Sequence, residues 1–212
     1  GDWEHNSNGP YVSHGRSPGN KTCTAPSNDR LGHCLKDLMS WLDRNPTDGP
    51  LLVFVDMKPS YNPGWAWDSN EVQLLDKKVQ EIVGSRLYSS RDLYRFATGQ
   101  NFPGRKTLRQ AVSDSGWPTM GTLKGKIIVT YTGGKLWRVN QGMGGAIDKY
   151  LDRNQLPFGF YCPDVESDAY ELRPGRSVDG IDYDDSQAIV CSNLKARDHY
   201  QVTANMADKH NQ

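Results

Sequence analysis

An acidic and a basic residue, Asp56 and Lys58, close an apolar run that begins at Leu51 and is bounded by Pro50 and Pro59. Side chains alternate along a β strand, so the acid and the base are expected to share one face at the carboxyl end of the strand. That end is where parallel α/β barrels keep their chemistry. A carboxylate there can hold a divalent cation, and an ammonium group can bind a phosphate oxygen. A solvated ion pair at the junction of strand and loop is the alternative, and the pair alone does not exclude it.

Two candidates for the same chemistry precede the apolar run. Asp2 lies before a polar turn, and His14 follows a predicted short strand over residues 11–13. Cleaving a phosphodiester requires positive charge near the non-bridging oxygens, which a cation held by carboxylates provides. It also requires a group that accepts and donates protons, and histidine suits both roles because its pKa lies near neutrality.

Apolar residues recur with two different periods, and these periods predict the elements that position the candidates. Helical spacing predicts helices over residues 31–42, 70–87, 108–115, 144–153 and 196–210. Continuous apolar runs predict strands over residues 51–58, 126–132, 158–162 and 188–192, with a weaker candidate within 87–96. Strands that alternate with helices indicate an α/β fold with a parallel sheet, open or closed. No repeat, low-complexity tract or linker interrupts the sequence, so one domain over residues 1–212 is expected.

The strand over residues 51–58 is expected to be buried on both faces, as strands of parallel sheets usually are. The helices over residues 31–42 and 70–87 would cover the face that carries Val53, Val55 and Met57. The candidate acid and base would then lie on the opposite face of the same strand.

Composition excludes some classes of partner and favours an extracellular protein. The sequence carries no formal net charge, so no basic field attracts nucleic acid, and no apolar run approaches the roughly 20 residues that span a bilayer. No signal peptide is recognised, which fits either a cytosolic protein or a processed one. Four cysteines without metal-binding spacing are typical of two disulfides in a secreted protein, and Asn20 begins a glycosylation sequon. We therefore expect a secreted protein.

The order of the three short motifs resembles the phospholipase C-like phosphodiesterase superfamily. Asp2, the pair His14-Gly15 and the motif Asp56-x-Lys58 follow one another with about the spacing of that superfamily. It includes glycerophosphodiester phosphodiesterases, phosphatidylinositol phospholipases C and the sphingomyelinase D-type phospholipases of spider venoms. The resemblance implies a TIM-type (β/α) barrel in which Asp2 and Asp56 hold Mg²⁺ or Ca²⁺. It also implies that His14 acts as a general acid or base and that Lys58 binds phosphate.

Later segments extend the resemblance. Residues 107–112, 116–119 and 125–129 are similar to the segment before the fifth strand of secreted, calcium-dependent phosphoinositide-type phospholipases C. The pair Cys23 and Cys34 is similar to a disulfide-closed loop of the venom-type enzymes. We expect the disulfides Cys23–Cys34 and Cys162–Cys191, since the cysteine count is even and lacks metal-binding spacing.

The loop after the Asp56-x-Lys58 motif carries three large aromatic residues, Tyr61, Trp65 and Trp67. Their position fits a lid or a contact with the membrane surface. Packing in the core is the alternative, and the sequence favours neither.

The sequence also departs from the superfamily. The first catalytic histidine and the metal-binding glutamate of the superfamily have no counterpart before Asp2, and no eighth strand follows residues 196–210. The expected barrel therefore lacks its first strand in this chain, and its last strand is in question. A companion chain, an incomplete sequence or a degenerate relative would each explain this.

The first expectation is a secreted, metal-dependent phosphodiesterase that cleaves the headgroup of a phospholipid or a glycerophosphodiester. The alternative is a non-catalytic relative that serves as a binding, storage or toxin-subunit protein. The sequence does not distinguish headgroups, nor hydrolysis from cyclising transfer.

Overall fold

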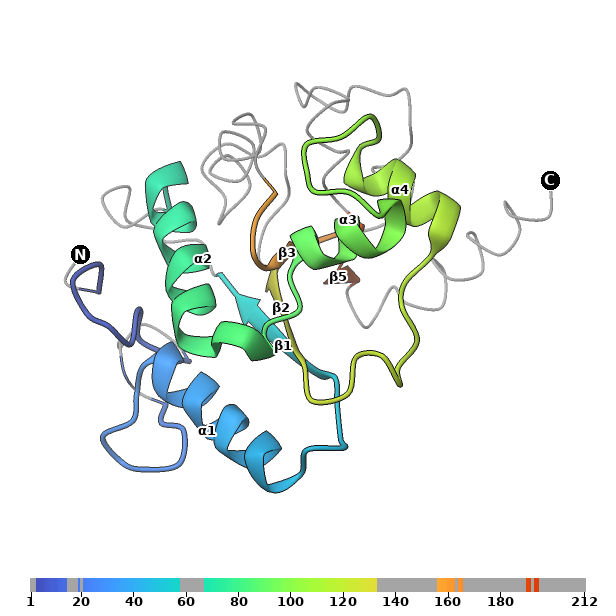
Figure 1. Ribbon diagram of the computed structural model, residues 1–212. Helices are drawn as coiled ribbons and strands as arrows, with labels where there is room; N and C mark the ends of the chain where they lie inside the picture. The colour runs from blue at the N-terminus through green and yellow to red at the C-terminus, as the bar shows by residue number, and fades with distance from the viewer. Residues whose placement is uncertain are drawn as a thin grey trace.

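The computed structural model describes residues 3–14, 19, 21–57, 67–132, 156–162, 164–165, 190–191 and 193–194. Within these residues the fold is α/β, with helices packed beside a parallel sheet (Figure 1). The sheet has the order β1-β2-β3, with strands β1 (Leu51–Asp56), β2 (Ile127–Thr132) and β3 (Phe160–Tyr161). A separate parallel pair consists of β4 (Asp164–Val165) and β5 (Asn193–Leu194). The expected α/β class and parallel sheet are therefore confirmed.

Local sequence accounts for most helix boundaries. The helices are α1 (Leu31–Arg44), α2 (Ser69–Val83), α3 (Ser90–Thr98) and α4 (Leu108–Ser115), and a 3₁₀ turn, η2 (Gly84–Arg86), follows α2. Each of α2, α3 and α4 begins with a capping box, in which the side chains of the first and fourth residues accept each other's backbone N–H groups. Gly116 ends α4 with a φ of 72°, which favours glycine. The predicted helices over 31–42, 70–87 and 108–115 are confirmed.

The weak strand prediction within residues 87–96 is wrong, because this segment begins α3. The Ser89 side chain accepts a hydrogen bond from Asp92 N, and the Asp92 side chain accepts one from Ser89 N. This cap starts a helix whose buried residues include Leu93 and Tyr94. Only Leu87 keeps a strand-like contact, a single parallel bridge to Ile127 on β2.

The first core lies between α1, α2 and one face of the sheet (Figure 1). Its fully buried side chains come from both helices and from β2: Leu35, Leu42, Val72, Leu75, Val79, Ile127, Val129 and Tyr131. Val53 and Val55 of β1 pack against this core, and Met57, just beyond β1, belongs to it. The expected cover of this face of β1 by the first two helices is therefore confirmed.

The opposite face of β1 is largely open, so the expected burial of the strand on both faces is wrong. Leu52 and Phe54 are 57% and 61% exposed, and Asp56 is exposed as well. The reason lies in the neighbours of the strand. Within the described residues β1 is the end strand of the sheet, and nothing packs over its second face.

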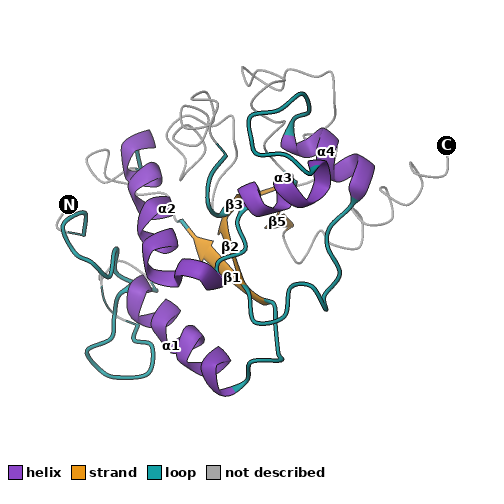
Figure 2. Cartoon of the chain, viewed as in Figure 1, coloured by secondary structure: helices purple, strands orange, loops and turns teal. Residues whose placement is uncertain are grey.

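A second core joins α3 and α4 to β2 and β3, away from α1 and α2 (Figure 2). Leu93, Leu108, Ile128 and Phe160 are among its buried members. The Trp117 ring, just after α4, lies 5.2 Å from the Phe160 ring, measured between centroids. This core covers the same side of β2 that is open on β1, because Ile128 pairs with Leu52 across the two strands.

A buried carboxylate ties α2 to the segment that leads into β3. Asp76 is 0% exposed and accepts hydrogen bonds from Tyr131 Oη at 3.1 Å, Phe158 N at 2.7 Å and Gly159 N at 2.8 Å. Position 159 requires glycine because a Cβ there would lie 2.5 Å from the Tyr131 ring. A carboxylate is costly to bury unless it is paired or hydrogen-bonded, and these donors offset that cost. Asp76 therefore holds α2, β2 and the start of β3 together.

The remaining predicted elements are placed only in part. The strands over 126–132 and 158–162 are confirmed as β2 and β3, although β3 is shorter. Residues 11–13 form no strand, only a bridge from Tyr11 to Arg30. Val190 and Cys191 are not in a strand, and β5 begins two residues later. The helices expected over 144–153 and 196–210 lie outside the described residues.

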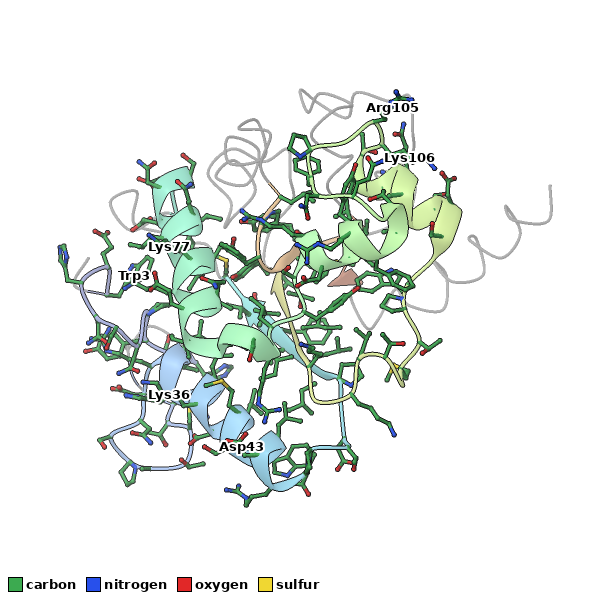
Figure 3. All side chains as sticks on the ribbon, viewed as in Figure 1. Trp3, Lys36, Asp43, Lys77, Arg105 and Lys106 are labelled. Atoms are coloured by element: carbon green, nitrogen blue, oxygen red, sulfur yellow. A yellow bond between two sulfur atoms is a disulfide. The ribbon has the colours of Figure 1, made fainter. Side chains whose placement is uncertain are left out.

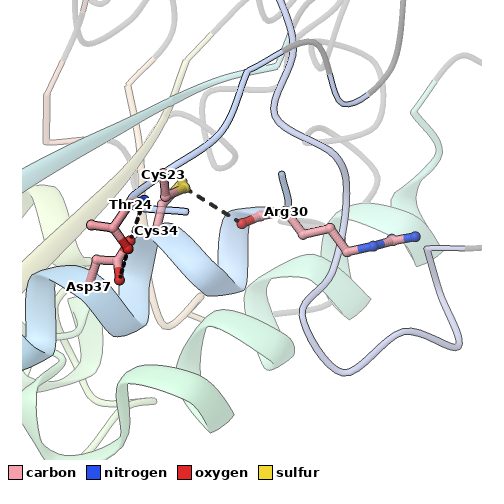
Figure 4. The surroundings of a disulfide bond; sticks show 5 residues. All are labelled: Cys23, Thr24, Arg30, Cys34 and Asp37. Carbon is pink, nitrogen blue, oxygen red and sulfur yellow. Dashed lines mark hydrogen bonds between the residues drawn. A yellow bond between two sulfur atoms is a disulfide. The ribbon is translucent and has the colours of Figure 1, made fainter. Parts of the chain in front are cut away.

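Both expected disulfides, Cys23–Cys34 and Cys162–Cys191, are present. The first joins the loop after His14 to α1, and closing a loop of this length stabilises a protein by about 3 kcal/mol in the chain-entropy model. Thr24 reinforces it through hydrogen bonds from its N and Oγ1 to Asp37, at 3.1 and 2.8 Å (Figure 4). None of the helices within the described residues is long and apolar enough to cross a membrane.

We predict that Val55→Asp unfolds this chain, whereas Phe54→Asp does not. Val55 packs against the first core, so an aspartate there would bring an unpaired charge into apolar surroundings. Phe54 is more than half exposed on the open face, and a charge there stays in water. Chemical denaturation of both variants tests this, and equal loss of stability would contradict the one-sided burial of β1.

We also predict that Asp76→Asn lowers the free energy of unfolding by about 2–4 kcal/mol, because a buried network loses charge-assisted acceptors. Asp43→Asn is the matched control. Asp43 pairs with Arg86 at the surface, where the side chain is 65% exposed, so its loss should cost at most about 1 kcal/mol. Urea denaturation of the two variants is the measurement. Equal losses of stability would show that Asp76 does not hold α2, β2 and the start of β3 together.

Candidate active site

Asp56 lies where the sequence predicted, at the carboxyl end of β1 with its side chain exposed. The pairing with β2 continues one residue further, because Met57 N donates to Thr132 O at 2.8 Å. The ladder therefore holds the backbone on both sides of the carboxylate. The side chain lies at the carboxyl edge of a parallel sheet. In parallel α/β barrels the catalytic residues lie at this edge.

Thr132 is a further candidate for the site, and the sequence did not reveal it. The register of β1 and β2 pairs Asp56 with Thr132, and directly paired residues share one face of a sheet. Thr132 is 2% exposed, so it is the buried member of this pair at the sheet edge. Carboxylate and hydroxyl oxygens are hard donors, the kind that Ca²⁺ and Mg²⁺ prefer. Finding Thr132 from the sequence would have required the strand register.

His14 lies at the surface, in the segment that leads from the N-terminal turns toward α1. This segment is held against the start of α1 by a bridge between Tyr11 and Arg30 and by a hydrogen bond from Val12 N to Asp29 O at 2.8 Å. The Arg30 guanidinium also lies 3.8 Å above the centre of the Tyr11 ring. The convergence of His14 with Asp56 stays a prediction.

Several predicted site residues lie outside the described residues. These are Asp2, Asn20, Lys58, Tyr61 and Trp65. Among the residues that the structure describes, no three His, Cys, Asp or Glu side chains lie close enough together to hold a metal. The expected ligand pair of Asp2 and Asp56 therefore stays a prediction.

Trp67 packs against other side chains. Its ring lies 5.5 Å from the Trp3 ring, measured between centroids, at an angle of 53°, and both tryptophans pack against the first core. Figure 3 labels Trp3, which lies beside α2. For Trp67 the structure thus favours the core-packing alternative. Contact of this loop with a membrane surface stays a prediction for its other two aromatic residues.

The start of α2, next to this tryptophan pair, carries carboxylates. Glu71 accepts a hydrogen bond from Asp68 N at 3.0 Å as part of the capping box. Burial raises the pKa of Glu71, the charges of Asp68 and Glu4 add to this rise, and the hydrogen bond from Asp68 N opposes it. The start of α2 therefore carries a group of neighbouring acidic side chains.

Cys162 follows β3 at the same edge of the sheet as Asp56. Its backbone N donates to Tyr131 O at 2.9 Å, which continues the ladder between β2 and β3. The disulfide with Cys191 anchors a distant part of the chain at this edge. The carboxyl edge is thus held by the two ladders and by a covalent bond.

Solved structures of two bacterial enzymes share this fold. One is a calcium-dependent phosphoinositol-specific phospholipase C from a Pseudomonas species, with 20% identity over 89% of this chain and a TM-score of 0.62. The other is a calcium-dependent phosphatidylinositol-specific phospholipase C from Streptomyces antibioticus, with 22% identity over 87% of this chain and a TM-score of 0.60. The matches cover 59% and 60% of those chains, so this chain spans about three fifths of their length.

A family model supplies independent support from the sequence. The model for calcium-dependent phosphoinositide phospholipase C matches residues 23–141, more than half of the chain. No curated protein matches the sequence. The matched residues include β1, α1 to α4 and β2, which are the elements that build the candidate site. The superfamily resemblance is confirmed, and the chain belongs to the calcium-dependent phosphoinositide phospholipase C family.

Proposed function

We propose that this protein cleaves the headgroup phosphodiester of a phospholipid, in a reaction that depends on a divalent cation. The observation that carries the proposal is the position of Asp56, which lies inside the matched family segment and at the carboxyl end of a parallel strand. The proposal includes a TIM-type barrel as the complete fold, formed as one domain. Shared fold with the two bacterial phospholipases supports this architecture.

The donor atoms at the site fit calcium. Asp56 and Thr132 offer oxygen atoms only, and the proposal adds the carboxylate of Asp2. Calcium takes six to eight oxygen ligands, so further oxygens from substrate or water would complete its shell. When bound, the cation would stabilise negative charge on the non-bridging oxygens of the phosphate.

His14 would transfer the protons of the reaction. The attacking hydroxyl group, from water or from the substrate itself, gives up a proton as its oxygen bonds to phosphorus. The bond from phosphorus to the leaving oxygen then breaks, and that oxygen takes a proton. His14 would serve as general base or general acid in these steps, and Lys58 would bind a phosphate oxygen.

The setting of this activity would be the outside of a cell. Two disulfides support it, since such bonds persist mainly in oxidising compartments. Tyr61 and Trp65 would touch the membrane surface that holds the substrate, and Asn20 would be a glycosylation site.

We predict that His14→Ala lowers phospholipid cleavage about 10²- to 10⁴-fold and keeps calcium affinity, because it removes a proton-transfer group only. His5→Ala is the matched control, since His5 is also exposed but lies in the N-terminal turns, and it should keep full activity. The assay uses phosphatidylinositol and phosphatidylcholine vesicles with calcium. An active His14→Ala variant would remove the histidine from the mechanism.

We predict that Asp56→Asn abolishes calcium binding, measured by isothermal titration calorimetry, without unfolding the chain. An exposed carboxylate contributes little to folding, but its charge attracts the cation. Asp43→Asn should bind calcium as the parent does. Calcium binding that depends on Asp56 in a protein that cleaves no phosphodiester would favour the non-catalytic relative.

We predict that Thr132→Val weakens calcium binding about tenfold, because valine lacks the hydroxyl group of threonine. Thr132→Ser keeps the hydroxyl group and should bind calcium as the parent does. Thr130→Val is the control on the same strand. The Thr130 hydroxyl donates to Val53 O at 3.2 Å, so its loss should lower stability and leave calcium affinity unchanged. Equal calcium affinity in the parent and Thr132→Val would exclude Thr132 from the site.

A further inference from the structure

Arg30 occupies a helix position that favours other residue types. It is the N-cap of α1, where Ser, Thr, Asp and Asn are preferred because their side chains accept a backbone N–H group. The Arg30 side chain forms no capping hydrogen bond, and a cation is unfavourable at the positive end of a helix dipole. By contrast, α2, α3 and α4 each begin with a capping box. The preferences of α1 therefore do not explain an arginine at this position.

The Arg30 side chain instead holds the segment that precedes His14. Its Nη1 donates to Gly9 O at 2.7 Å, and its guanidinium lies 3.8 Å above the centre of the Tyr11 ring. A hydrogen bond from a charged donor is stronger than a neutral one, and the cation is also attracted to the face of the ring. The two contacts lie on either side of Pro10, so they fix the path of the chain there.

The backbone pairing of this segment is short. Three hydrogen bonds join residues 8–12 to residues 29–32: Gly32 N to Asn8 O at 2.8 Å, Leu31 N to Pro10 O at 2.9 Å and Val12 N to Asp29 O at 2.8 Å. A two-stranded pairing of this kind is only marginally stable by itself. The Cys23–Cys34 disulfide joins two residues that both follow His14, and the Arg30 side chain points away from it (Figure 4). Arg30 therefore restrains a part of the chain that the disulfide does not join.

The chain returns to the same contacts after His14. Gly19 has a φ of 70°, and a Cβ at this position would lie 2.7 Å from Asp29 Oδ2 and 3.3 Å from Tyr11 Cδ1. Glycine is therefore required for this close approach. Val12 and Gly19 both lie against Asp29, and His14 lies between them in the sequence.

We propose that Arg30 is a positioning residue for His14. Its guanidinium holds Gly9 and Tyr11 against the start of α1, and α1 packs on the sheet, so the histidine is fixed relative to the candidate site. The effect on turnover rests on the proton-transfer role of His14 given under Proposed function. A proton-transfer group acts only within hydrogen-bond reach of the reacting atom, and a displacement of about 1 Å can lower turnover about 10²-fold.

Arg30→Ser tests the proposal, because serine removes the guanidinium and adds the side chain that the N-cap prefers. In the parent, we expect a ¹⁵N order parameter of about 0.85 for the His14 amide, as in rigid backbone, and a value below about 0.6 in the variant. The value of kcat on phosphatidylinositol vesicles with calcium should fall at least about tenfold, while calcium affinity stays unchanged. An unchanged order parameter at His14 would overturn the proposal, whether or not the protein cleaves phospholipid.

Arg86→Ser is the matched control. Arg86 Nη1 also donates to a backbone carbonyl, Gly125 O at 3.2 Å, and the guanidinium pairs with Asp43. These contacts hold α1 and the turn before β2, so their loss should lower the urea midpoint and leave both kcat and the order parameter of His14 unchanged. Equal loss of order at His14 in the two variants would mean a general loosening of the chain and would contradict the proposal.

The His14→Ala background separates this inference from the proposed function. Arg30→Ser should lower kcat in the parent and leave the residual turnover of His14→Ala unchanged, because the side chain through which it acts is gone. A further loss of similar size in that background would overturn the inference. If His14→Ala is fully active, the catalytic role of His14 fails, and the order parameter in Arg30→Ser still decides whether Arg30 positions the segment.

Discussion

The parallel pairing of β1 with β2 is the constraint on which the rest of the structure depends. It joins residues 51–56 to residues 127–132 in a fixed register, although three helices and several turns separate them along the chain. The register decides which side chains share a face. Asp56 and Thr132 become neighbours at the carboxyl edge, and Leu52 and Phe54 are directed away from the first core. A shift of one residue would exchange these roles.

The pairing of β1 with β2 gives the two faces of β1 different surroundings. On one face, Val53 and Val55 complete an apolar layer under α1 and α2, and burial of that layer supplies much of the driving force for folding. On the other face, the second core extends over β2 and, within the part of the chain that the structure describes, stops before β1. The candidate site and the open apolar surface therefore lie on one side of the same strand.

A buried carboxylate makes the arrangement of β2 and β3 specific. Asp76 comes from α2, yet its hydrogen-bond donors come from Tyr131 and from the backbone of Phe158 and Gly159. An apolar residue at position 76 would leave those two backbone N–H groups without this acceptor, and buried donors are costly to leave unpaired. The charge thus restricts how α2 can pack on the sheet. At the carboxyl edge, the disulfide of Cys162 adds a covalent constraint.

The sequence by itself determined the elements whose signals are local. Apolar periodicity predicted α1, α2, α4 and the strands β1 and β2, because helix and strand periods depend on neighbouring residues. It also predicted Asp56 at a strand end and, through motif order, the superfamily. The segment 87–96 was assigned wrongly because the box formed by Ser89 and Asp92 outweighed a short apolar run. The signal that decides this segment, the capping box, is also local in the sequence.

Only the tertiary structure decided which residues meet. Thr132 was missed because its place beside Asp56 depends on the register of two distant strands. The role of Asp76 was missed because its donors lie far along the chain. The open face of β1 contradicted a sound local expectation, since a run such as Leu51 to Asp56 does not show whether a strand will have one neighbour or two. Local patterns set the backbone conformation, but burial and proximity depend on contacts between segments that the sequence does not place side by side.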